Sequence, residues 1–324
     1  MSYSNQQPVR VFAPASIGNV GVGFDSLGLA LAPLEDVYLG DRITISCHAG
    51  KKDSLICSGP FVHHLPEDED NLVMKAVEAY FAHPDCQALE KPTLRIELEK
   101  YLPVGSGLGS SACSVVAALT AMNQFMDDHL DDLALMKVMA QLEGGISGAM
   151  HFDNIAPCYF GGMQLMVPSQ QQPFQQVPAF TDWYWVMAFP GFKLNTAASR
   201  AVLPKELSLQ ESILFAQYLS GFVSSSYQQN AQSALDMLKD VVAEPHRAAL
   251  IQGFAEAKKA LTQEGETVVG ISGAGPTLFA VCREKERAEQ CVTWLKENYL
   301  QSDEGFVHIC RAAEKGAKNW YEEE

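Results

Sequence analysis

The sequence predicts an α+β protein of two domains, or of one large domain, on three observations. The chain has 324 residues, of which 47% are hydrophobic and 19% are charged, so it can fill one large core or two ordinary ones. Segments with the two-residue period of strands alternate with segments of helical period, without internal repeats or low-complexity tracts. A run rich in Gln and Pro, residues 168–178, is the best linker candidate. We therefore expect domains over residues 1–168 and 169–324.

The first half of the chain contains strands with one buried face and helices with an apolar side. In the segment 94–98, for example, Leu94, Ile96 and Leu98 alternate with charged residues. From Ser110 to Met126 apolar and small residues recur at helical spacing on most sides, which is typical of a buried helix. We expect strands over 9–13, 41–47 and 94–98, and helices over 72–81, 110–126 and 133–142, the last closed by Glu143 and two glycines.

The second half continues the alternation. A tight turn, Ser272 to Pro276, separates two short apolar segments and predicts a pair of strands. We expect strands over 183–189, 268–271, 277–282 and 306–310, and helices over 207–227, 230–242, 248–261 and 284–299.

Charge and composition exclude several classes of protein. The 23 Lys and Arg against 39 Asp and Glu give a formal charge of −16, which makes nucleic acid and anionic membrane poor partners. No apolar run reaches the roughly 18 residues that a membrane span needs, and residues 1–14 lack a signal-peptide core. The eight cysteines are far apart and form no CxxC pair, so we expect buried thiols. We expect a soluble, cytoplasmic protein.

The strongest motif is the glycine-rich segment from Pro103 to Ala112, PVGSGLGSSA, between a predicted strand and a predicted helix. Its glycines let the backbone N–H groups curl inward, and the helix adds its positive end, so the segment suits a di- or triphosphate. The alternative is a tight turn that binds nothing. A Walker A loop would need GxxxxGK[ST] and a Rossmann fingerprint GxGxxG, whereas this spacing is GxGxG, which also disfavours a dehydrogenase.

A second segment, residues 142–157, brings Glu143 together with His151, Asp153 and Asn154. These residue types hold metals, accept amines or orient hydroxyls, although a polar turn with a satisfied histidine explains the cluster equally well. As a metal site it is weak, because no second His or acid follows His151 at the spacing of one helical turn. The glycine-rich segments 13–28 and 269–277 are weak signals when taken alone.

Taken together and in this order, these segments resemble the three motifs of the GHMP kinases. Finer blocks resemble the homoserine kinase branch of that family, of the enterobacterial threonine-pathway type, nearly from end to end: APASIGNVGVGFDSLGLAL, LPVGSGLGSSACSVVAAL, LEGGISGAMHFDNIAPCYFGGMQLM, FPGFKLNTAASRAVLP, EPHRAALIQGF, GISGAGPTLFAVC and EGFVHICR. The resemblance implies a two-domain fold, with an N-terminal domain like ribosomal protein S5 and a ferredoxin-like C-terminal domain. It also implies transfer of the γ-phosphoryl group of ATP, with Mg²⁺, to the side-chain hydroxyl of L-homoserine.

The resemblance assigns residues to each part of this reaction. By resemblance, Ser111 and Glu143 hold the Mg²⁺, and Asn71 lies near the adenine. The nucleotide-binding residues that it implies are Asn71, Pro103, Val104, Gly105, Ser106, Gly107, Leu108, Gly109, Ser110, Ser111, Ala112 and Cys113. The substrate-binding residues that it implies are Asn19, Asp25, His151, Asn154, Thr196, Arg200 and Arg247.

Within this set, Asn19 and Asp25 resemble the pair that binds the amine, and Arg200 and Arg247 the clamp that binds the carboxylate. Asn154, Glu143 and Arg200 are the expected catalytic residues, with Asn154 nearest the reacting hydroxyl. Because an amide accepts no proton near pH 7, we predict catalysis by positioning and charge stabilisation, without a dedicated protein base.

Two other functions remain open from the sequence. A GHMP kinase for another small alcohol, such as mevalonate, would share the fold, but mevalonate has no amine to pair with Asp25. A non-catalytic nucleotide-binding regulator would be expected to have lost Glu143 or a serine of the glycine-rich segment, and both are present. The resemblance further implies a homodimer, and threonine is a plausible feedback inhibitor because it shares the amino and carboxylate groups of homoserine.

Overall fold

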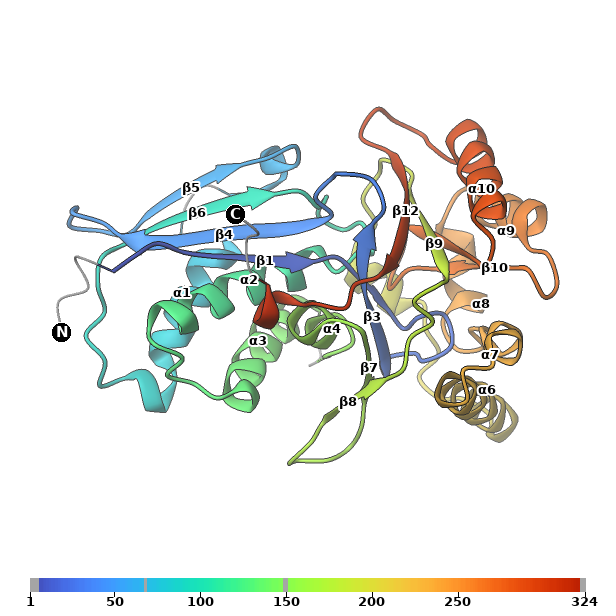
Figure 1. Ribbon diagram of the computed structural model, residues 1–324, viewed down its shortest axis with the longest axis horizontal. Coiled ribbons are helices and arrows are strands. Elements are labelled where there is room, and N and C mark those ends of the chain that lie inside the picture. Colours follow the sequence, from blue (N-terminus) through green and yellow to red (C-terminus); the bar gives the residue numbers. More distant parts are fainter. Residues whose placement is uncertain (1–5, 67–68, 148–150, 321–324) are drawn as a thin grey trace.

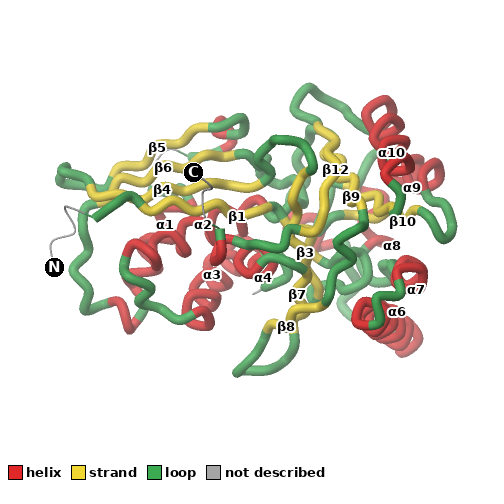
Figure 2. Tube along the Cα trace, viewed as in Figure 1, coloured by secondary structure: helices red, strands yellow, loops and turns green. Residues whose placement is uncertain are grey.

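A computed structural model of the chain describes residues 6–66, 69–147 and 151–320. Its strands form two sheets that lie side by side (Figures 1 and 2). One has four strands in the order β1-β4-β6-β5, and the other has eight, in the order β10-β11-β9-β12-β3-β7-β8 with β2 paired to β3. Residues 148–150 of the segment 142–157 lie outside the described residues.

The four-stranded sheet is antiparallel except for the parallel pair β5 and β6. Its strands are β1 (Val9–Pro14), β4 (Gly40–Cys47), β5 (Ser54–Ser58) and β6 (Leu94–Lys100). Helices gather on one face of it (Figure 1): α1 (Leu72–Ala82), α2 (Ser110–Phe125), α3 (Asp132–Ser147) and α4 (Ile155–Phe160). Helix α2 packs against β1, β4 and the other three helices, and is buried on nearly all sides. Its small and apolar composition therefore reflects a central position in the core.

The eight-stranded sheet contains a ferredoxin-like unit. Strands β9 (Tyr184–Phe189), β10 (Thr267–Ile271), β11 (Leu278–Cys282) and β12 (Phe306–Ala312) follow the spatial order β10-β11-β9-β12, with all neighbours antiparallel. Helices lie between β9 and β10 and between β11 and β12, which completes the β-α-β-β-α-β pattern. The helices are α5 (Thr196–Ala201), α6 (Leu209–Tyr227), α7 (Ala231–Met237), α8 (Glu244–Arg247), α9 (Phe254–Leu261) and α10 (Lys285–Asn298).

Strands that precede β9 in the chain extend this sheet. Strand β12 pairs with β3, which in turn pairs with β2 and β7, and β7 pairs with β8. These strands are β2 (Ser16–Gly18), β3 (Leu27–Pro33), β7 (Met163–Met166) and β8 (Phe174–Val177). The short 3₁₀ helices are η2 (Val62–His64), η3 (Pro84–Cys86), η4 (Ala248–Leu250) and η5 (Ala317–Asn319).

The Gln- and Pro-rich run does not link two separate bodies, so its interpretation as a linker is wrong. Strands β7 and β8 pair antiparallel from Met163↔Val177 to Met166↔Phe174, which makes the intervening residues the loop of a hairpin. Turn-forming residues occur in hairpin loops and in linkers alike, and composition does not separate the two. The domain boundary at residues 168 and 169 stays a prediction.

Three predicted helices are interrupted or differ from the structure by more than two residues at one end. The helix expected over 230–242 ends at Met237, and the one expected over 248–261 is divided into η4 and α9. Gly253 between them has a φ of +83°, which a continuous right-handed helix does not contain. Helix α3 continues to Ser147, past the two glycines expected to close it. Strands β2, β3, β5, β7 and β8 and helices α4, α5 and α8 were not predicted from the sequence.

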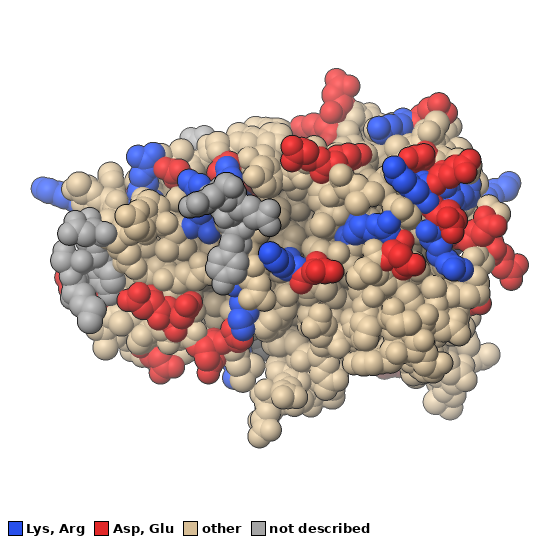
Figure 3. Space-filling model, viewed as in Figure 1, with Lys and Arg blue, Asp and Glu red and all other residues tan. Residues whose placement is uncertain are grey.

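Charges of both signs share the surface drawn in Figure 3, and most of the cysteine thiols are buried. On the face drawn in Figure 3, basic side chains are interspersed with acidic ones and form no extended patch. Among the described helices, none combines the length and apolar character that crossing a bilayer requires. The eight cysteines, all within the described residues, form no disulfide, and six of them are buried.

Candidate active site

The glycine-rich segment forms the connection between β6 and α2. Gly105, Gly107 and Gly109 have φ values of +69°, +82° and +68°, in the left-handed region that favours glycine. A Cβ atom on Gly107 would lie 2.5 Å from the carbonyl oxygen of Ser272. The chain can therefore follow this path only with glycine, and α2 begins directly after it at Ser110. A backbone curled in this way at a helix N-terminus suits a phosphate.

The turn between β10 and β11 holds this loop in place. The hydroxyl of Ser272 donates to the carbonyl of Gly107 at 2.7 Å, and the N–H of Thr277 donates to the carbonyl of Ser106 at 3.0 Å. The N–H of Leu194 donates to the carbonyl of Gly105 at 3.0 Å. The glycine-rich segment 269–277, weak as a signal in the sequence, thus supports the phosphate loop from the other half of the chain.

A cavity of about 300 Å³ opens beside the loop. From the predicted nucleotide-binding set it is lined by Val104, Gly105, Ser106, Gly107, Gly109, Ser110 and Ser111. The structure does not bring the rest of that set to it: Leu108, Ala112 and Cys113 are fully buried in the core, and Pro103 is buried as well. Neighbours in a loop or helix point to different sides, so a continuous stretch of sequence overstates the contact surface.

Asn71, expected near the adenine, is also absent from the residues that line this cavity. Its side chain is 1% exposed and caps α1, accepting from the N–H of Val73 at 3.0 Å. Its amide donates to the carbonyl of Pro66 at 2.7 Å. These bonds give Asn71 a structural role at the start of the helix.

A second, smaller cavity of about 70 Å³ adjoins the first. It is lined by every predicted substrate-binding residue: Asn19, Asp25, His151, Asn154, Thr196, Arg200 and Arg247. The two cavities share Glu143, Asn154, Thr196, Gly273 and Ala274. A small molecule in the second cavity would therefore meet a phosphate chain in the first along this common wall.

The centre of the small cavity is the carboxylate of Asp25. Arg200 donates to it with both terminal nitrogens, at 2.6 and 3.4 Å, and His151 Nδ1 lies 3.5 Å from it. The side-chain oxygen of Asn19 accepts from the N–H of Asp25 at 2.8 Å. Burial lowers the pKa of His151, which favours its neutral form. The cavity thus presents an anion and a cation in direct contact.

Arg247 adds a second guanidinium from the end of α8. It is 4% exposed and donates to the carbonyls of Ser199 at 3.1 Å and Gly273 at 2.9 Å. The ring of Phe24 lies 5.5 Å from this guanidinium and 5.8 Å from that of Arg200. Backbone carbonyls and an aromatic face stabilise the buried cation without neutralising it, so it stays available to a ligand carboxylate.

Two polar pairs stand on the wall that the cavities share. The hydroxyl of Ser16 donates to Asn154 Oδ1 at 2.9 Å and fixes the orientation of that amide. The hydroxyl of Ser111 donates to Glu143 Oε1 at 2.7 Å, and burial raises the pKa of Glu143. A hydroxyl and a carboxylate adjacent to a phosphate site are the hard oxygen ligands that Mg²⁺ prefers, so this pair fits the predicted ion.

Asp153 also lines the small cavity, although the sequence analysis gave it no role. It is 5% exposed, and burial, together with the neighbouring charge of Asp25, raises its pKa to about 7. The signal was present in the segment 142–157, where Asp153 stands beside His151 and Asn154. The sequence analysis included it in that cluster, but the family resemblance assigned roles only to His151 and Asn154.

The glycine loop at a helix N-terminus and the adjoining charged cavity suit a phosphotransferase. The N-terminal domain model of the GHMP kinases matches residues 71–162, and the C-terminal model of the same family matches residues 222–300. The chain belongs to the GHMP kinase family, and the predicted two-domain fold is confirmed. Kinases of this family use ATP as co-substrate.

Solved structures add detail to the assignment. The chain is similar to homoserine kinase from Cytophaga hutchinsonii ATCC 33406, with 29% identity over 98% of both chains and a TM-score of 0.85. It resembles L. major mevalonate kinase with 14% identity over 98% of this chain and 100% of that one, and a TM-score of 0.70. Phosphomevalonate kinase from Streptococcus pneumoniae gives 12% identity over 93% and 99%, and a TM-score of 0.67. At such low identity the last two comparisons show the fold alone.

Proposed function

We propose that the chain is a homoserine kinase, which transfers the γ-phosphoryl group of ATP to the side-chain hydroxyl of L-homoserine in threonine biosynthesis. The products are O-phospho-L-homoserine and ADP. The observation that carries the proposal is the small cavity, where Asp25 lies between Arg200 and His151, with Arg247 on the same wall and the phosphate loop adjacent. The similarity to a homoserine kinase over nearly the whole chain supports it.

The charges of the cavity match a zwitterion. The ammonium group of homoserine would bind at the carboxylate of Asp25 and the side chain of Asn19, and its carboxylate at the guanidinium groups of Arg200 and Arg247. The ion pair between Asp25 and Arg200 already provides both signs at hydrogen-bond distance. A ligand with a carboxylate but no amine would compete with Asp25 for Arg200 and bring a second negative charge beside it, which is costly.

Catalysis in this proposal depends on position and charge. Asn154, oriented by Ser16, lies on the wall between the cavities and would bind the hydroxyl at the point where it meets the γ-phosphate. The N–H groups of the glycine loop and of the first turn of α2 would stabilise the charge of the phosphates. Ser111 and Glu143 would hold Mg²⁺, which would neutralise part of the phosphate charge. A loose transition state asks little of the nucleophile, so we propose that no protein base is required.

The experiment that tests the substrate is an ADP-release assay with homoserine, mevalonate, serine and galactose as acceptors. We expect turnover with homoserine and at most slow turnover with the others. Turnover with mevalonate and not with homoserine would refute the proposal and leave a GHMP kinase of different specificity. Asp25→Asn sharpens the result: we expect a higher KM for homoserine, whereas loss of kcat at unchanged KM would show that Asp25 acts on the reaction itself.

Three further properties follow from the resemblance and stay proposals. Threonine, which has the same amino and carboxylate groups, would compete for Asp25, Arg200 and Arg247, and competitive inhibition against homoserine tests this. A homodimer is expected, and sedimentation of the purified chain tests it. A cytoplasmic location is expected from the sequence.

A further inference from the structure

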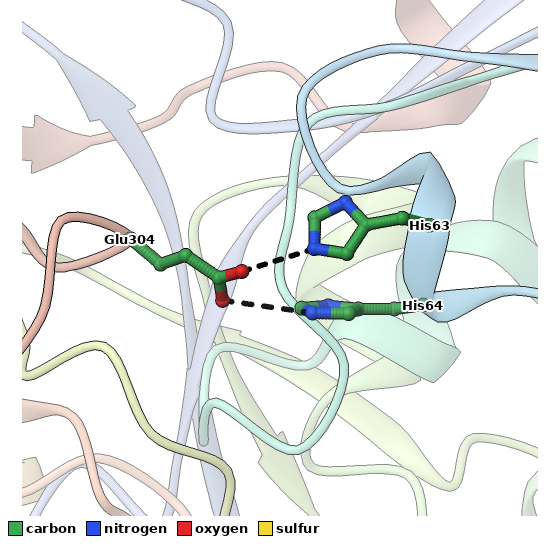
Figure 4. Close-up of side chains that lie close together, drawn as sticks. All are labelled: His63, His64 and Glu304. Atoms are coloured by element: carbon green, nitrogen blue, oxygen red, sulfur yellow. Dashed lines mark hydrogen bonds and ion pairs between the residues drawn. The ribbon is translucent and has the colours of Figure 1, made fainter.

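Two histidines and a glutamate form a cluster outside both cavities (Figure 4). His63 and His64 come from η2, and Glu304 comes from the loop before β12. His63 Nε2 lies 3.0 Å from Glu304 Oε1, and His64 Nε2 lies 3.5 Å from Glu304 Oε2. Each imidazole thus directs its own Nε2 atom toward the carboxylate of Glu304, although 241 residues separate His63 from Glu304.

The spacing of these atoms suits a metal ion. One ligand atom from each of the three residues lies within 4.8 Å of the others. Zinc binds imidazole nitrogen and carboxylate oxygen at about 2.0–2.2 Å, which places the ligand atoms of a tetrahedral site about 3.4 Å apart. The observed separations of 3.0 and 3.5 Å lie on either side of that value, so an ion could replace the protons between the groups after small side-chain rotations.

The cluster is also partly preorganised. The side chain of His64 is 8% exposed and its ring stacks on Phe61, with 6.0 Å between ring centroids. Its Nδ1 atom is buried and has no hydrogen-bond partner within the described parts of the chain. His63 and Glu304 are 53% and 41% exposed, which leaves the ion a path from solvent. One ligand is therefore fixed in the protein, and the other two can close around an ion.

Neighbouring lysines limit the affinity, and Lys100 is one that interacts electrostatically with His64. Lys193 is close enough to interact electrostatically with both His64 and Glu304. A cation near the site repels a divalent ion, and three protein ligands bind more weakly than the four of a structural zinc site. We therefore expect reversible binding.

We propose that His63, His64 and Glu304 bind a divalent transition-metal ion of the zinc class, with water in the remaining position. The ion would join the segment after β5 to the loop before β12, and so tie a loop of one sheet to a loop of the other. Mg²⁺ prefers oxygen ligands, so this site would not take the ion that accompanies ATP. The proposal does not depend on the proposed function.

The test is titration of the full chain, freed of metal by a chelator, with Zn²⁺ in a calorimeter. Two variants change exposed ligands without disturbing the core: His63→Ala, and Glu304→Gln, which keeps a hydrogen-bond acceptor but removes the charge. The matched controls are His48→Ala and Glu264→Gln, which alter exposed residues elsewhere. We expect one Zn²⁺ per chain, affinity at least tenfold lower in the two ligand variants, and unchanged affinity in the controls.

A second readout reports on the ligands directly. Four-coordinate Co²⁺ with nitrogen and oxygen ligands absorbs visible light much more strongly than aqueous Co²⁺, so strong bands should appear with the wild-type chain and be lost in both ligand variants. Zn²⁺ should also raise the melting temperature of the wild type and of the controls more than that of the ligand variants. Equal Zn²⁺ affinity in the wild type and both ligand variants, or no saturable binding to the wild type, would overturn the proposal.

Discussion

The buried carboxyl of Asp153 should make the free energy of unfolding depend on pH, and Asp153→Asn should remove this dependence. Burial raises its pKa from the ordinary 3.8 to about 7. The unfolded chain thus releases this proton near pH 4, and the folded chain releases it near pH 7. Between these values the folded state holds more protons, so its stability falls as the pH rises and is lowest above the folded pKa.

The magnitude follows from the same two values. A pKa difference of about 3 corresponds to about 4 kcal/mol of destabilisation once both states are ionised. From pH 5 to pH 8 the expected loss from this group is about 3 kcal/mol, because the folded carboxyl stays protonated up to about pH 7. Asp153→Asn preserves the shape of the side chain and cannot ionise, so this loss should be absent from the variant.

Urea unfolding of the wild type and the variant at pH 5, 6, 7 and 8, without nucleotide or metal, measures the effect. Between pH 5 and pH 8 the free energy of unfolding of the variant should rise by about 3 kcal/mol relative to that of the wild type. Asp182→Asn, at an exposed position, is the matched control and should give a curve parallel to that of the wild type. Parallel curves for Asp153→Asn would refute the reasoning, since the carboxyl would then be ionised at the same pH in both states.

The same variant tests the role of Asp153 in the reaction. Its carboxyl lines the cavity beside Asn154 and is therefore a candidate general base, which the prediction of catalysis without a base excludes. If no base is needed, kcat of Asp153→Asn stays within about tenfold of the wild type. A fall of about 10²-fold to 10⁴-fold, the range for loss of a general base, would identify Asp153 as that base.

Three other substitutions examine separate parts of the site. Arg200→Lys loses the two-pronged contact, so KM for homoserine should rise about tenfold or more in steady-state kinetics while KM for ATP stays unchanged; an equal rise in both would contradict a substrate role. Gly107→Ala should weaken ATP binding about tenfold and lower the melting temperature, because the added Cβ would meet the Ser272 carbonyl. The control Gly145→Ala, at a position with open space around it, should leave stability unchanged or raise it. Asn154→Asp should not raise kcat in the ADP-release assay. An increase by orders of magnitude would show that a base at this position accelerates the reaction, which contradicts the prediction that no base is required.

Residue patterns predicted the elements in which residue type follows burial most closely. Strand β6 alternates Leu94, Ile96 and Leu98 with charged residues, and the structure buries those three side chains. Helix α2 is apolar on most sides and lies at the centre of a helical layer. In both elements the apolar residues are buried, so the residue types alone indicate side chains that face the core.

Elements with weaker patterns were missed or misjudged. Strand β5 is only half-buried, and the hairpin of β7 and β8 contains the Gln- and Pro-rich run that also suits a linker. The break before α9 depends on Gly253 taking a positive φ, which a helical pattern does not reveal. Such features depend on tertiary contacts and local backbone geometry, which residue periodicity does not record.

The substrate cavity could be predicted only through the family resemblance. Its residues extend from Asn19 to Ala274 and come from separate loops and helices, and no local spacing predicts that these segments meet. The resemblance located the residues that contact the ligand, while the structure added those that hold them: Ser16 behind Asn154, and Ser272 beneath the glycine loop. It also separated the glycine-rich segment into residues that face the cavity and residues that fill the core.

The loop that carries Asp25 shows why the sequence alone could not place that carboxylate. Asn19, Val20 and Asp25 all have positive φ, at 69°, 48° and 53°. Asn and Asp tolerate this conformation, but a branched residue such as Val20 pays about 1–3 kcal/mol for it. The strain persists because Val20 is fully buried and because Asn19 accepts from the N–H groups of Gly23 and Asp25, which fixes the turn on both sides. The formal charge of −16 describes the chain as a whole and does not predict where a single carboxylate lies. The carboxylate of Asp25 lies against Arg200 because the strained backbone of this loop places it there.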